Sequence, residues 1–241
     1  MVYGLEWRQG LRWRAPETGA PDCEKSMSDN RHSKPTRRRI LPRKVRRDQL
    51  IRATMKCIAG NGLSGTTMAQ VTREAGLSMG IANLHFESKE KLLIETLKFV
   101  TDEYNRGHDS ILASDKFPTT SARMEALLQF DLGPRVTQRT KIAVWFAFWG
   151  EAKSRPTYQR ICTRTDVLAE RAVSELFRAA IDEGGYQHAD PELLASGYTA
   201  LIDGLWLDLL VTPRTLSRKK AGRVARHYLA SAFPKHIQPD P

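Results

Sequence analysis

The side chains best placed for chemistry lie between residues 67 and 93, where hydroxyl, amide and amine groups recur at short intervals. Thr67 and Ser78 each stand directly before a short apolar-patterned segment, where a hydroxyl caps the start of a helix. Gly76 lies between the two segments and permits a tight turn. Two short helices joined in this way form a helix-turn-helix, whose second helix enters the DNA major groove. The amide groups at each helix start could also receive a phosphate.

A second set of chemically useful side chains lies in the C-terminal half and is aromatic. Trp145 and Trp149 are four residues apart, so they share one face of a helix. Asp203 is a carboxylate in an otherwise apolar segment that also holds Trp206, and burying it alone would be costly. Aromatic faces beside a carboxylate suit a quaternary ammonium ligand through cation–π attraction. Aromatic residues at helical spacing are also common in plain cores, so both interpretations stay open.

Catalysis and metal binding have little support in the sequence. His188 and Asp190 are close in sequence, but no nucleophile, glycine-rich phosphate loop or paired-carboxylate motif accompanies them. The three cysteines, Cys23, Cys57 and Cys162, are odd in number and lack metal-type spacing. We therefore expect a binding protein of the reducing cytoplasm, with no disulfide framework, metal or cofactor.

Charge is concentrated at the N-terminal end. The chain of 241 residues has a formal net charge of +11, and residues 1–47 hold 13 Lys or Arg against 5 Asp or Glu. We expect residues 1–43 to form a disordered basic arm that follows DNA phosphates, with an inert solvated tail as the alternative. Met27 is a second plausible start, so the sequence leaves open whether residues 1–26 are translated. No signal peptide is apparent, and residues 198–211 are too short and too charged for a membrane span.

The elements that position these side chains are all helical by their apolar spacing, and no alternating strand pattern is present. We expect an all-α fold with a three-helix helix-turn-helix domain at 44–104, a larger helical ligand-binding and dimerisation domain at 105–234, and a tail at 235–241. The expected helices cover residues 45–60, 67–75, 78–86, 89–113, 121–132, 137–153, 156–183, 191–211 and 216–233.

The segment around the two short helices resembles the TetR family of bacterial transcriptional regulators. The matching positions are Thr67, Ala75, Gly76, Ser78, Gly80, His85, Phe86, Lys89 and Leu92. Asn83 stands where that family usually has a phosphate-contacting tyrosine. With the neighbouring basic residue, the resemblance implies a DNA-contacting set of Arg46, Thr67, Ser78, Met79, Gly80, Asn83, Leu84, His85 and Lys89.

Two later stretches resemble the BetI-type branch of that family, the choline-responsive repressors of glycine-betaine synthesis genes. These are Trp145-Phe-Ala-Phe-Trp149 and Ala200-Leu-Ile-Asp-Gly-Leu-Trp206. The resemblance implies a cytoplasmic homodimeric repressor that binds operator DNA on the nucleoid, dimerises through its last two long helices and releases DNA when an effector binds. The implied ligand set is Trp145, Trp149, Asp203 and Trp206, and the implied effector is choline or a related quaternary ammonium.

Three alternatives remain at this point. The chain is a regulator of the same kind that answers a different small molecule, a basic DNA-binding scaffold with no effector, or a membrane-surface protein that uses its basic end. The sequence favours the effector-responsive regulator and predicts no membrane partner.

Overall fold

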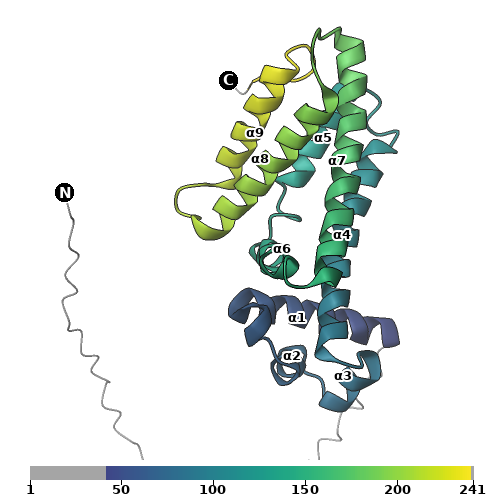
Figure 1. The fold of residues 1–241 in the computed structure, drawn as a ribbon, viewed down its shortest axis with the longest axis vertical. Helices are drawn as coiled ribbons and strands as arrows, with labels where there is room; N and C mark the ends of the chain where they lie inside the picture. The colour runs from purple at the N-terminus through teal and green to yellow at the C-terminus, as the bar shows by residue number, and fades with distance from the viewer. Residues whose placement is uncertain (1–41, 240–241) are drawn as a thin grey trace, which may run out of the picture. The chain divides into compact units, whose positions relative to one another are not determined.

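The computed structural model describes residues 42–239, which form nine α-helices and contain no strand (Figure 1). The all-α prediction is confirmed, and each predicted helix is present with small shifts at its ends. The predicted basic arm lies outside the described residues, except for Pro42 and Arg43 at its end. Met27 and Cys23 also lie outside them. The helices are α1 (Arg43–Gly65), α2 (Met68–Ala75), α3 (Met79–His85), α4 (Lys89–Leu112), α5 (Thr120–Asp131), α6 (Arg139–Ala152), α7 (Pro156–Gly184), α8 (Pro191–Val211) and α9 (Arg218–Ala232).

Helices α1 to α3 gather at one end of this part of the chain (Figure 1). The buried face of α1 carries the residues predicted from apolar spacing, among them Leu50, Cys57 and Ile58. The regular helix breaks at Gly62, where φ is 70°. This left-handed conformation suits a residue without Cβ, which is why the glycine-rich stretch ends the main part of α1. A last helical turn to Gly65 follows the break.

Helix α4 connects the small helices to the larger set. It packs against α1 at one end and against α5, α6 and α7 along its length. It runs without a break through residues 104 and 105, where the sequence places a domain boundary. A movement of its C-terminal half is therefore passed to the α1–α3 group through a continuous helix.

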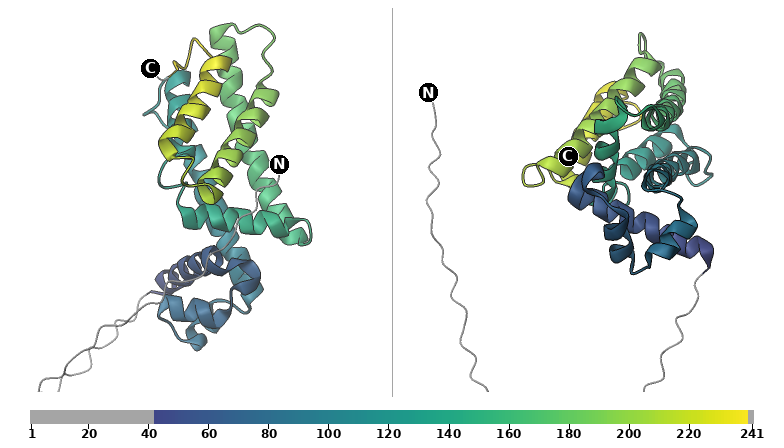
Figure 2. Two further views of the ribbon diagram at one scale, coloured as in Figure 1. Left: turned by 90° about the vertical axis from the view of Figure 1, so that its left-hand side faces the viewer. Right: turned by 60° about the horizontal axis from the view of Figure 1, so that its bottom comes forward.

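Helix α6 lies between the two groups of helices, as the views of Figure 2 agree. It packs on α1 on one side and on α7 and α8 on the other. Its buried residues include Trp145 and Phe148. This aromatic helix therefore contacts both the helix-turn-helix region and the helices of the C-terminal part.

Helix α8 is apolar on most of its surface, but in a single chain it is buried on one side only. Tyr198, Ile202 and Trp206 are buried, whereas Leu207 and Val211 are 41% and 60% exposed. By length and composition α8 is the one helix in the described range that could cross a membrane, a test that a helix packed against other protein also passes. The exposed apolar side of α8 is the kind of surface that a second subunit covers.

The chain beyond α9 packs on the body of the protein in its described part. Ile237 is buried, and His236 Nδ1 lies 2.9 Å from the Tyr186 hydroxyl. The predicted tail at 235–241 thus begins with ordered contacts.

Candidate functional site

The turn between α2 and α3 is fixed by side chains that cap both helices. Thr67 Oγ1 accepts a hydrogen bond from Gln70 N at 3.2 Å, and Gln70 Oε1 accepts one from Thr67 N at 2.8 Å, which completes a capping box. Gly76 ends α2 with φ 63°. Ser78 Oγ accepts from Ile81 N at 3.4 Å. The N-caps predicted at Thr67 and Ser78 are confirmed, and they fix the angle between the two helices.

Helix α3 presents an exposed polar and apolar edge. Only Ala82 of this helix is fully buried, and Leu84 is 69% exposed although it is large and apolar. The other exposed residues of the predicted DNA-contacting set here are Ser78, Met79, Gly80 and Asn83. The structure therefore brings these five residues to one accessible edge, while their contacts with DNA stay a prediction.

Positive charge lies close to this edge. The pKa of His85 is lowered by burial and then by the nearby charges of Arg43 and Arg47. Arg47 pairs with Glu95 and lies over the Phe86 ring, 5.4 Å from its centroid. These contacts anchor the start of α1 beside α3 and the start of α4.

Two predicted phosphate ligands already have partners within the protein. Lys89 Nζ lies 3.5 Å from the Ser64 carbonyl oxygen, a long contact that is easily exchanged for another acceptor. Arg46 Nη1 donates to Gln49 Oε1 at 3.1 Å. Both side chains are part-exposed. The contact with the Ser64 carbonyl oxygen gives Lys89 a structural role that does not depend on DNA.

A cavity of about 230 Å³ opens in the C-terminal part, and all four predicted ligand-binding residues line it. Trp145 and Trp149 reach it from α6, and Asp203 and Trp206 from α8. The ring centroids of Trp145 lie 6.1 Å from those of Trp149 and 6.3 Å from those of Trp206. The sequence prediction that these residues meet is thus matched by their positions.

The cavity is also lined by residues outside the ligand-binding set predicted from the sequence. They come from four helices and are mostly acidic or phenolic: Tyr104, His108, Asp131, Asp166, Glu170 and Tyr198. The described lining includes no Lys or Arg. Four carboxylates therefore share one small cavity in which His108 is the only basic side chain.

Asp131 is the structural centre of the cavity floor and is 0% exposed. Its Oδ1 accepts from Tyr104 at 3.1 Å and lies 2.9 Å from His108 Nε2, and its Oδ2 accepts from Tyr198 at 2.9 Å. Its backbone oxygen accepts from Trp206 Nε1 at 2.8 Å. Burial, then the charge of Asp131, raises the pKa of both tyrosines well above the usual value, so they remain donors. Asp131 thereby ties α4 and α8 to the end of α5.

Asp166 and Asp203 differ from Asp131 because no hydrogen bond or ion pair to either carboxylate is found among the described residues. Burial, then the charge of Glu170, raises the pKa of Asp166 to about 6. Burial, then the charges of Asp166 and Asp131, raises the pKa of Asp203 to about 7. Two carboxylates that lack a cation thus face a cavity with aromatic walls.

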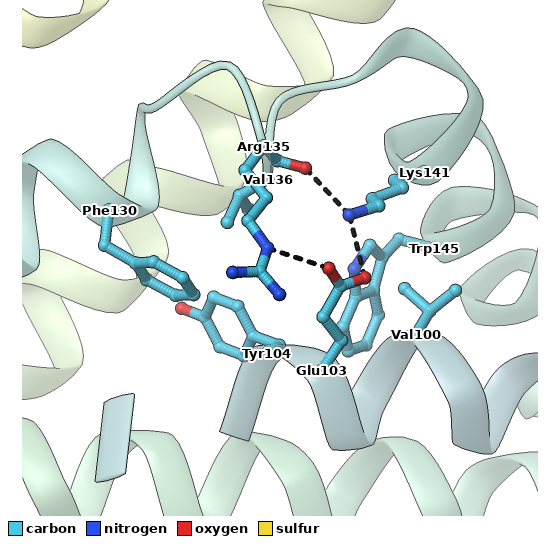
Figure 3. Close-up of a pocket in the computed structure, with 8 residues that line it drawn as sticks. All are labelled: Val100, Glu103, Tyr104, Phe130, Arg135, Val136, Lys141 and Trp145. Atoms are coloured by element: carbon cyan, nitrogen blue, oxygen red, sulfur yellow. Dashed lines mark hydrogen bonds and ion pairs between the residues drawn. The ribbon is translucent and has the colours of Figure 1, made fainter. Parts of the chain in front are cut away.

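Two basic residues, Arg135 and Lys141, line a small opening that shares Tyr104 and Trp145 with the cavity (Figure 3). Arg135 Nε and Lys141 Nζ donate to the two oxygens of Glu103 at 3.0 and 2.8 Å, and Lys141 also donates to the Arg135 carbonyl at 2.9 Å. Burial alone raises the pKa of Glu103, but the two cations outweigh it and lower the pKa. The opening between them holds only about 10 Å³, roughly one water molecule.

Comparisons with known proteins agree with this arrangement. Residues 50–96 match the family model of bacterial regulatory proteins of the tetR family, and residues 120–234 match that of the BetI-type transcriptional repressor C-terminal domain. The HTH-type transcriptional regulator BetI of Escherichia coli K12 is 30% identical over 201 residues, which are 79% of this chain and 95% of that protein.

The chain belongs to the TetR family of transcriptional regulators. Its C-terminal domain is of the BetI type. As a TetR-family protein it is a DNA-binding repressor that responds to an effector and acts as a dimer in the cytoplasm. The predicted family and class of function are confirmed, whereas the identity of the effector and the role of each site residue stay predictions.

Solved structures show the same TetR fold. A transcriptional regulator from Pseudomonas aeruginosa PAO1 is 26% identical with a TM-score of 0.69, over 82% of this chain and 96% of that one. A transcriptional regulator from Saccharomonospora viridis, determined in complex with choline, is 19% identical with a TM-score of 0.65, over 77% of this chain and 96% of that one. The second likeness concerns the fold alone.

Proposed function

We propose that this TetR-family repressor is released from its operator by an organic cation with an alkylated ammonium group, choline being the first candidate. The observation that carries the proposal is the cavity in which three tryptophans meet carboxylates that no described cation neutralises. A cation over a tryptophan face is stabilised by about 0.5–2 kcal/mol, most when water is excluded. The choline complex of the Saccharomonospora regulator, and the resemblance of this chain to the choline-responsive BetI-type repressors, support the same ligand class.

The packing of α6 offers a physical route from the cavity to DNA. Trp145 and Trp149 line the cavity, and the helix that carries them packs directly on α1. An effector that binds one arrangement of α6 better than another shifts the population of the two arrangements. In a dimer, the shift changes the spacing of two α3 helices that must fit successive major grooves.

We assign the DNA contacts to the exposed edge of α3 and to the charges beside it. Asn83 supplies base or phosphate hydrogen bonding, and Met79, Gly80 and Leu84 contact the groove and its walls. Thr67, Ser78, His85, Lys89 and Arg46 contact phosphates. The exposed side of α8, with α9, is the proposed dimer surface. The expected basic arm before residue 42 adds sequence-independent affinity, and binding to the nucleoid follows from these contacts.

The test is a calorimetric titration of the dimer with choline and with its neutral carbon isostere, 3,3-dimethylbutan-1-ol. Choline should bind and lower operator affinity, and the isostere should bind far more weakly because it lacks the charge. A Trp149→Leu variant should lose choline binding and keep operator binding, since it leaves the exposed edge of α3 and the charges beside it unchanged. Equal binding of the two ligands, or no response to either, contradicts the proposal and returns these aromatics to a role in packing.

A regulator of an uncharged drug or metabolite and a scaffold without effector are the other readings of the same fold. The first predicts that the neutral isostere or other apolar molecules displace DNA. The second predicts no ligand response and no discrete footprint on DNA.

A further inference from the structure

The acidic side of the cavity exceeds what one positive charge can neutralise. Asp166 and Glu170 lie one turn apart on α7, and Asp203 faces them from α8. Like charges four residues apart on a helix destabilise it unless something lies between them. After burial, the charge of Glu170 contributes to the raised pKa of Asp166, and the charge of Asp166 to the raised pKa of Asp203, so the Asp166 carboxylate lies close to both. No group of three such ligands among the described residues is arranged to hold a metal ion.

The basic residues beside these carboxylates are paired with other acids. Arg171 and Arg178 share a surface groove with Glu170 but pair with Glu175 and Glu192. Arg135 and Lys141 are occupied by Glu103 and line the small opening beyond Tyr104 and Trp145 (Figure 3). Glu170 accepts a hydrogen bond from the Ser196 hydroxyl, which is neutral. Asp166 is exposed and Glu170 is half-buried, so both carboxylates lie at the edge of the cavity, where a cation that enters can reach them.

His108 adds a buried polar group to the wall of the cavity. It lines the cavity and is 2% exposed, and its Nδ1 has no partner among the described residues. Its Nε2 faces the Asp131 carboxylate, an acceptor, so we assign the proton to Nε2 and an acceptor lone pair to Nδ1. A buried acceptor without a donor is costly. The Nδ1 atom is itself inaccessible, so the donors of a ligand go to the carboxylates at the cavity edge. A primary or secondary ammonium has N–H to donate to them, whereas a quaternary ammonium has none.

The volume of the cavity also fits a ligand that carries a second polar group. A dry cavity of roughly 150 Å³ is enough to hold benzene, and this cavity measures about 230 Å³. A trimethylammonium head against the tryptophans leaves room for a short chain and a second polar group. Aromatic faces reach the cavity from α4, α6 and α8, and the carboxylates other than Asp131 come from α7 and α8.

From these observations we propose that the effector is an elongate organic dication. One alkylated ammonium lies against Trp145, Trp149 and Trp206 near Asp203, and a second cationic centre that carries N–H lies beside Asp166 and Glu170. The proposal rests on the cation-binding function argued above, and it adds how many positive charges the effector carries and of what kind. A monocation such as choline fills only the tryptophan side of the cavity.

The decisive comparison uses two molecules that differ in one group. (3-Aminopropyl)trimethylammonium carries two positive charges, and (3-hydroxypropyl)trimethylammonium is its singly charged match with the same number of heavy atoms. Calorimetry on the full-length dimer should show the dication binding about 10- to 100-fold more tightly, the range expected for one charge-assisted hydrogen-bonded pair. The dication should also release operator DNA at correspondingly lower concentration.

Two variants separate the acidic wall from a general charge effect. Asp166→Asn should reduce the affinity ratio of the two ligands to about threefold or less, a difference below one kcal/mol, while binding of the monocation changes little. Asp182→Asn removes a charge from an exposed position of α7, outside the described cavity lining, and should leave the ratio unchanged.

Failure of the dication proposal can be distinguished from failure of the cation-binding proposal on which it rests. If both ligands bind equally, or if the ratio persists in Asp166→Asn and in Asp166→Asn/Glu170→Gln, the dication inference is overturned while cation binding stands. If neither ligand binds the unaltered protein, the cation-binding function itself is wrong. Operator binding by each variant, measured in parallel, reports whether it is folded.

Discussion

Acidification from about pH 8 to about pH 6 should weaken choline binding by about tenfold, because the carboxylate that attracts the cation becomes protonated. The pKa of Asp203 is about 7, raised first by burial, and that of Asp166 is about 6. Choline lies near Asp203 and away from Asp166. If only the ionised form of Asp203 attracts it, its affinity falls about tenfold between these pH values. Choline has a permanent charge, so its own titration does not contribute.

The neighbouring groups define what else could titrate in this experiment. Asp203 on α8 is faced by groups from α4, α5 and α7: Tyr104, His108, Asp131, Asp166 and Glu170. Both Tyr104 and Tyr198 have pKa values raised well above the usual value, first by burial, so they stay neutral throughout. Asp203→Asn should therefore remove most of the pH dependence, and Asp182→Asn, at an exposed position of α7, should retain it.

The stability of the unliganded protein provides an independent check on the direction of the Asp203 pKa shift. A carboxyl whose pKa is raised on folding binds more protons in the native state than in the unfolded chain between the two pKa values. The unliganded protein should thus lose stability as the pH rises from about 4 to about 7 through this group, and Asp203→Asn should reduce that loss. Calorimetric titrations at constant ionic strength, together with thermal unfolding, measure both effects. A choline affinity that does not change with pH would refute the reasoning.

Four other changes test separate parts of the account. Asn83→Ala should weaken operator binding by about 1–3 kcal/mol and relax the preference at one position of each half-site, unless this residue is outside the base-reading set; competition with altered operators measures both. Lys89→Ala should weaken binding to all DNA sequences alike and lower the salt slope by about one unit per subunit, and a slope left intact argues against a phosphate contact. Asp131→Asn should lower the free energy of unfolding by about 1.5–3 kcal/mol for each charge-assisted hydrogen bond lost, as urea titration would show; unchanged stability would mean that the buried network is not formed. Leu207→Asp, on the exposed side of α8, should shift the dimer towards monomer in sedimentation, and an intact dimer would place the interface elsewhere.

The helices were predictable because their signals are local. Thr67 and Ser78 cap the helices that follow them, and Gly62 and Gly76 take positive φ where the sequence suggested that helices end. Apolar spacing marked the faces that became buried, as at Leu50 and Ile58. Each of these features depends on residues within about one turn of one another, so no knowledge of long-range packing was needed.

The ligand cavity was predictable only where its residues repeat along one helix. Trp145 and Trp149 are unusual in composition, and Asp203 is conspicuous among apolar neighbours. Asp131 and Asp166, by contrast, look like ordinary surface acids at helical positions. They become part of the cavity only because α5 and α7 pack against α4 and α8, and such long-range contacts leave no periodic mark in the sequence.

The central claim is that occupation of the cavity and binding of the operator oppose each other, and reciprocal titration tests it most directly. Choline affinity should be measured with and without saturating operator DNA, and operator affinity with and without saturating choline. Linkage requires the two affinities to fall by the same factor, typically about 5- to 150-fold. Choline binding that is unaffected by the operator, or operator binding that is unaffected by choline, would contradict the account.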